Sequence, residues 1–90
     1  MTKKLKLTNG AKLIASQQFP HPMDHYLHHV LCEYNDQFVV WVHNETCGGC
    51  YEGGYWTTIE KAADDFFAQI DKQWGPAFTF NLKNKMELVA

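Results

Sequence analysis

The sequence predicts an α+β fold, in which a mainly antiparallel sheet of about five to six strands carries one amphipathic helix on one face. Three observations predict it. Tight-turn signals join alternating segments in the first half, one segment at about residues 58–74 has helical spacing of apolar residues, and alternation then returns. Hairpins that precede a single helix are typical of α+β proteins. With 90 residues, the chain is expected to form a single domain, residues 1–90.

The first hairpin is predicted in the segment LKLTNGAKL near the N-terminus. A two-residue turn at Asn-Gly would place apolar residues opposite polar ones. A three-residue loop over residues 8–10, with its glycine in the left-handed region, pairs Leu5 with Leu13 and Leu7 with Ala11. Since the hydrophobic pattern determines strand register, we expect the three-residue loop.

A second hairpin is predicted after a proline-containing linker over residues 16–24. Its tight turn is Asn35-Asp36, and a two-residue turn pairs Cys32 with Val39 and His28 with His43. One face then carries Leu27, Leu31, Phe38, Val40 and Val42. The other carries Tyr26, His28, Val30, Cys32, Val39, Trp41 and His43. We expect the helix on the first face, and the N-terminal hairpin, a C-terminal strand or a second subunit on the other.

Residues 45–53 are predicted to form a glycine-rich loop, and residues 54–57 a short third strand. The helix follows, with Thr57 and Glu60 as a candidate capping box. Its buried stripe is expected to consist of Ile59, Ala62, Ala63, Phe66, Phe67, Ile70 and Trp74. The Gly-Pro pair at 75–76 is expected to end it.

The C-terminal segment is predicted to return to the sheet. Residues 77–82 alternate apolar and polar side chains like a strand, residues 83–85 form a turn, and residues 86–90 form a final edge strand. These two segments bring the predicted number of strands to five or six.

Composition excludes several classes of function. The formal net charge is -2, and all eight basic residues are lysines, whereas arginine is the preferred residue for bidentate contacts to phosphate and guanine. We therefore expect no nucleic-acid partner. The charged N-terminus lacks the apolar run of a signal peptide, and no segment approaches the roughly 20 apolar residues of a membrane span. A cytoplasmic protein without a membrane partner is expected, with its three cysteines as thiols or metal ligands.

The segment CGGC has the spacing of half a tetrahedral zinc site. Cys32 lies in mid-hairpin and is better interpreted as a small buried hydrophobic residue. His28 and His43 face each other at the hairpin end from which Cys47 and Cys50 depart. The sequence thus permits a Cys2His2 site for one structural zinc ion, whose ligands are Cys47, Cys50, His43 and His28. The alternative is that the cysteines are free loop thiols and that the histidines are ordinary strand residues.

A catalytic redox dithiol is disfavoured, because the predicted helix begins about seven residues after Cys50 and its dipole cannot act on either thiol. The carboxylates Asp64 and Asp65 are interpreted as part of the solvated helix face. The sequence contains no complete nucleophile, phosphate-loop or hydrolase motif. We therefore expect no enzymatic activity.

Aromatic residues provide the other candidate site. Because such residues are enriched at interfaces, Trp41, Tyr26, Tyr34 and Tyr55 form a predicted interaction surface. Packing of Trp41 and its neighbours under flanking strands is the favoured alternative. The sequence as a whole predicts a non-catalytic protein-interaction or regulatory module without a cofactor. Its partner would be another protein or a second copy in a homodimer, and a structural zinc module is the alternative function.

Overall fold

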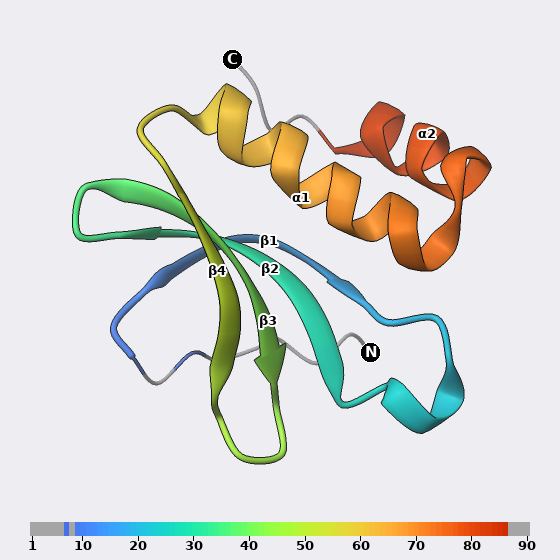
Figure 1. Ribbon diagram of the computed structural model, residues 1–90, viewed down its shortest axis with the longest axis horizontal. Helices are drawn as coiled ribbons and strands as arrows, with labels where there is room; N and C mark the ends of the chain where they lie inside the picture. Colours follow the sequence, from blue (N-terminus) through green and yellow to red (C-terminus); the bar gives the residue numbers. More distant parts are fainter. Residues whose placement is uncertain (1–6, 8, 87–90) are drawn as a thin grey trace.

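Four consecutive strands form an antiparallel sheet in the order β1-β2-β3-β4, and two helices follow them (Figure 1). The structure, a computed structural model, describes residue 7 and residues 9–86. The elements are β1 (Lys12–Gln18), the short 3-10 helix η1 (Pro22–Asp24), β2 (Leu27–Tyr34), β3 (Gln37–Asn44), β4 (Cys50–Trp56), α1 (Ile59–Trp74) and α2 (Pro76–Lys85). The predicted α+β class, with α1 packed on one face of an antiparallel sheet, is confirmed.

The β2–β3 hairpin has the predicted register. His28 pairs with His43 and Cys32 pairs with Val39 along an uninterrupted antiparallel ladder. The two turn residues Asn35 and Asp36 have φ angles of 52° and 61°, which is the type I′ geometry that matches the twist of the flanking strands. The two-residue turn therefore accounts for the register.

The main core lies between α1 and the sheet. Leu31 and Val40 from the central strands pack with the buried side of α1. The buried residues of α1 are Ala62, Ala63, Phe66, Phe67 and Ile70, all of them in the predicted stripe. The predicted cap, however, is wrong by one residue. Thr58, rather than Thr57, is the N-cap, because it has the extended backbone of a cap and its hydroxyl accepts a hydrogen bond from the Lys61 backbone N–H at 3.4 Å.

A smaller core covers the opposite face of the sheet. Its buried residues are Val30, Cys32, Val39 and Trp41. Leu7, Ala11 and Leu13, from the N-terminal segment, pack against them. Of the three covers considered for this face, the N-terminal segment thus supplies at least part. Gly10 has the predicted left-handed conformation, with φ of 86°, whereas the predicted strand residue Leu5 lies outside the described residues.

The largest difference from the predicted fold is at residues 77–82, which belong to helix α2 and not to a strand. Phe78, Leu82 and Met86 have helical spacing and pack against the main core. Pro76 occupies the first turn of α2, where its missing N–H costs no hydrogen bond. The predicted strand over 86–90 lies almost wholly outside the described residues. The described part of the chain therefore has four strands where five to six were expected.

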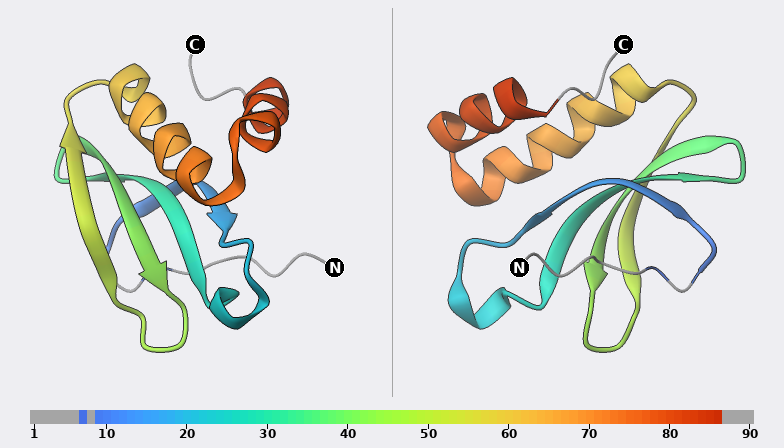
Figure 2. Two further views of the ribbon diagram at one scale, coloured as in Figure 1. Left: turned by 45° about the vertical axis from the view of Figure 1, so that its right-hand side comes forward. Right: turned by 180° about the vertical axis from the view of Figure 1, so that it is seen from behind.

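Helix α2 lies alongside α1, as the two views of Figure 2 show. Only Gly75 separates the two helices, and its φ angle is 90°. The rings of Trp74 and Phe78 stack across this connection at 4.0 Å between centroids. Within residues 9–86, no helix is long and apolar enough to cross a membrane.

Candidate functional site

The cysteine segment is a compact turn, not the predicted loop over residues 45–53. Strand β4 already begins at Cys50, which pairs with His43. Asn44 holds the turn closed: its backbone N–H donates to the Gly49 carbonyl at 2.8 Å, and its carbonyl accepts from the Gly48 N–H at 2.7 Å. Residues 50–53, which were predicted to be loop because of their glycines, therefore belong to strand β4.

The end of the sheet next to this turn, called here the hairpin end, brings together His28, His43 and Cys50 on one face. The Sγ of Cys50 lies 3.5 Å from Nδ1 of His43, and Nε2 of His28 lies 3.1 Å from a carboxylate oxygen of Glu45. Burial, followed by the charge of His28, lowers the pKa of His43. Burial also raises the pKa of the Cys50 thiol. Both shifts favour the neutral forms, so the Cys50–His43 contact is that of a neutral pair.

Cys47 belongs to the opposite side of the hairpin. Its Sγ lies 3.3 Å from the hydroxyl of Tyr51. Since successive residues of a strand point to opposite faces, Tyr51 and Cys50 are directed away from each other. The Tyr51 hydroxyl, followed by the Gly49 N–H, donates to the sulfur and lowers the pKa of exposed Cys47. The two cysteines of the CGGC segment therefore have different surroundings: Cys47 contacts Tyr51, and Cys50 contacts His43.

This division bears on the predicted zinc ligands. Among the residues that the structure describes, no group of three or more His, Cys, Asp or Glu side chains could hold a metal ion. His43 and Cys50 are in contact, and His28 faces His43, as predicted. Cys47 would have to leave Tyr51 to join them. Cys32, by contrast, is fully buried as predicted, and burial raises its pKa to about 12.

The predicted aromatic surface is only partly exposed. Trp41 is 7% exposed and packs edge-on against both Tyr34 and Tyr55, at centroid distances of 5.6 and 6.4 Å. A bulge in β4 places two residues opposite Trp41, and a Cβ on one of them, Gly53, would lie 2.9 Å from the indole nitrogen. Trp41 is thus a core residue, whereas Tyr26 and Tyr55 remain exposed.

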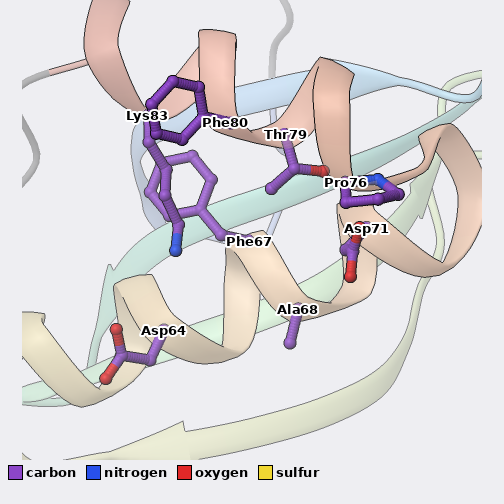
Figure 3. A pocket seen from close by; sticks show the side chains of 8 residues that line it. All are labelled: Asp64, Phe67, Ala68, Asp71, Pro76, Thr79, Phe80 and Lys83. Carbon is purple, nitrogen blue, oxygen red and sulfur yellow. The ribbon is translucent and has the colours of Figure 1, made fainter.

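A groove between α1 and α2 is a feature that the sequence did not predict. It encloses about 510 Å³, within the usual range for ligand sites (Figure 3). Its lining residues are Asp64, Phe67, Ala68 and Asp71 from α1, and Pro76, Thr79, Phe80 and Lys83 from α2. Both sets follow the spacing i, i+3, i+4, i+7, so each helix presents one continuous stripe to the groove.

The groove combines an aromatic interior with charged edges. Phe67 is almost completely buried, whereas Phe80 on the other helix is 66% exposed. The Nζ of Lys83 lies 5.6 Å from the centroid of the Phe67 ring, within range of a cation–π interaction. Asp64 and Asp71 line the α1 side of the groove and are exposed.

Two sequence signals could have revealed this groove. Gly75-Pro76 was interpreted only as a stop, although proline after glycine also begins helices. Phe78, Leu82 and Met86 fit a helix as well as Phe78, Phe80 and Leu82 fit a strand. The period-two interpretation hid α2, and without α2 the groove could not be inferred.

A buried histidine lies under α1. His29 is 3% exposed and stacks on Phe19, with ring centroids 4.4 Å apart. Neither ring nitrogen has a hydrogen-bond partner among the described protein groups. Burial lowers its pKa to about 4. The ring lines a cavity of about 30 Å³ together with Asp65 and Gln69, which hydrogen bond to each other at 3.2 Å.

Comparison with known proteins identifies no relative: no protein family, curated protein or solved structure matches the chain. The function is therefore argued from the hairpin end and the groove alone.

Proposed function

We propose that the protein is a non-catalytic interaction module that binds a protein partner in the α1–α2 groove. The observation that carries the proposal is Phe80, which is 66% exposed on one wall of the groove. Apolar patches rimmed by polar residues mark interaction sites. The rings of Phe80 and Phe67 lie beside Lys83, and the carboxylates of Asp64 and Asp71 lie farther along α1 (Figure 3).

The chemistry of the groove supports binding rather than catalysis. Its lining has two carboxylates, one ammonium group and one hydroxyl. That hydroxyl, on buried Thr79, donates to the Gly75 carbonyl at 2.9 Å and is therefore used within the helix. None of the eight lining residues pairs a nucleophile with a base, which is the arrangement that covalent catalysis requires.

The test is selection of peptides from a random displayed library on the immobilised protein, followed by affinity measurements on variants. We expect Phe80→Ala to weaken binding of the selected peptides by about tenfold or more, since aromatic anchors dominate such interfaces. Met23→Ala is the matched control, because Met23 is 77% exposed on η1 and outside the groove. Selected peptides that bind wild type and Phe80→Ala equally would overturn the proposal.

A structural zinc module is the second candidate, because Cys50 contacts His43 and His28 faces that histidine. Zinc measured after purification under reducing conditions is the test. About one equivalent per chain, lost in Cys50→Ser together with a lower melting temperature, would support it, since structural zinc contributes directly to folding. Substoichiometric zinc and an unchanged melting temperature on chelation would remove it.

We also propose a cytoplasmic location, which is supported by three cysteines that form no disulfide. The proposal predicts complete alkylation of three thiols in protein that is extracted from cells under acid quenching. A disulfide found in such protein would count against it.

A further inference from the structure

We infer that the occupant of the groove is an amphipathic helix with basic residues beside its apolar stripe. The inference rests on the proposed function, since it names the class of partner that the α1–α2 groove recognises. Three features of the groove carry it: its shape, the distribution of its charges and a cation already held over its aromatic floor.

The shape of the groove fits a third helix. The α1 stripe runs from Asp64 to Asp71 and the α2 stripe from Pro76 to Lys83, so each wall is two helical turns long. Side chains three or four residues apart form ridges on a helix, and the ridges of one helix pack into the grooves between those of another. An apolar helix face laid into such a groove is a common mode of peptide recognition.

The charges favour a basic occupant. The lining carries two carboxylates against one ammonium group, which is a formal charge of -1. Asp64 and Asp71 are seven residues apart on α1, about 10 Å along the helix axis. A partner helix with lysine or arginine residues seven apart on the flank of its apolar stripe would place one cation near each carboxylate.

A cation of the chain itself, the Lys83 ammonium group, already lies over Phe67, the aromatic floor of the groove. The lysine reaches across from α2 and lies over the ring of a residue on α1. A lysine or arginine of the partner has the same chemistry, a charged head on an apolar stem, and can use the exposed face of Phe80 in the same way. An acidic helix would gain only Lys83 and would face two carboxylates.

Two synthetic peptides test the inference. Each has about 18 residues, long enough to be partly helical, with capped termini and leucine at i, i+3, i+4, i+7 spacing. One has lysine on the flanks of the leucine stripe and the other has glutamate at the same positions. Binding of fluorescein-labelled peptide is measured by anisotropy at about 0.02 M and about 0.3 M salt. We expect the lysine peptide to bind about tenfold more tightly at low salt, and the preference to shrink at high salt.

Three variants separate the charge preference from binding itself. Asp64→Asn/Asp71→Asn should abolish the preference for lysine. Glu33→Gln/Asp36→Asn, which changes the net charge equally at the β2–β3 turn, should retain it. Phe80→Ala should weaken both peptides by about tenfold.

Each remaining outcome is decisive. Equal binding of the two peptides that depends on Phe80 would overturn the basic partner and leave the proposed function standing. Binding that ignores Phe80 would overturn both. A wild-type dimer that sedimentation detects and that Phe80→Ala dissociates would identify a second copy as the occupant, and would overturn the basic helix.

Discussion

The hairpin end and the α1–α2 groove differ in how far their side chains are satisfied within the chain. At the hairpin end, six polar side chains meet in pairs: His43 meets Cys50, Cys47 meets Tyr51, and His28 meets Glu45. In the groove, by contrast, a phenylalanine remains two-thirds exposed. The cysteine segment, which is conspicuous in the sequence, thus forms contacts within the chain, whereas helix α2 leaves an aromatic side chain exposed to solvent.

The largest expected effect is a difference in stability between variants at the floor of the groove, Phe67, and at its wall, Phe80. Phe67→Ala should lower the free energy of unfolding by about 3–4 kcal/mol, because it removes a ring that is 94% buried in the main core. Phe80→Ala should change it by less than about 0.5 kcal/mol, because that ring is mostly in water. Urea unfolding of both variants measures the difference. A large loss of stability in Phe80→Ala would mean that the groove wall serves the core rather than a partner.

His29 sharpens the comparison, because its ring nitrogens are also unsatisfied but lie inside the protein. Its pKa is about 4 in the folded chain, against an ordinary value of 6.5. The unfolded state therefore takes up a proton first as the pH falls. Stability is complete above about pH 6.5 and is lost as the pH falls toward 4, by about 3 kcal/mol.

The measurement is the free energy of unfolding between pH 7 and 4 for wild type and His29→Leu. Leucine cannot titrate, so the curve of the variant should be flatter by about 3 kcal/mol over this range. Parallel curves would show that His29 does not cause the loss of stability at low pH, and that carboxylates or other histidines do.

A smaller effect tests the satisfied pairs at the hairpin end. Cys47 is exposed and its pKa is lowered, whereas the pKa of Cys50 is raised by burial. Iodoacetamide at neutral pH should therefore modify Cys47 before Cys50, since the thiolate is the reactive form. Tyr51→Phe removes the donor hydroxyl and should slow modification of Cys47 by about threefold. Peptide mass analysis of a time course follows both sites, and an unchanged Cys47 rate in Tyr51→Phe would contradict the assigned cause of the shift.

Sequence reasoning succeeded where the local pattern favours one solution. A two-residue turn at Asn35-Asp36 specifies the β2–β3 register, so the His28–His43 pair was predictable. At the start of α1 the pattern allows two solutions. Two adjacent threonines can each cap a helix, and the backbone conformation selects Thr58. A hydroxyl pattern alone cannot make that choice.

The predicted zinc site was harder to assess from the sequence, because the spacing of two cysteines does not determine the directions of their side chains. The separation of Cys47 from Cys50 says nothing about where β4 begins, and the onset of pairing at Cys50 directs the two sulfurs into different contacts. The groove depended on a further step. Its two walls, α1 and α2, are adjacent in sequence. The α2 segment was predicted to be a strand, because its apolar residues were matched to a period of two instead of the helical period.

Gly75 gives the groove an unusual dependence on one residue. Two helices are joined here without a loop, and a Cβ at this position would meet no atom within 4 Å, so only the backbone conformation excludes other residues. Handedness, not space, is what the position requires. A mirror-image alanine introduced by chemical synthesis should preserve the distance between the walls, whereas ordinary alanine should alter it. The spacing of the groove walls thus depends on the handedness of the backbone at a single residue.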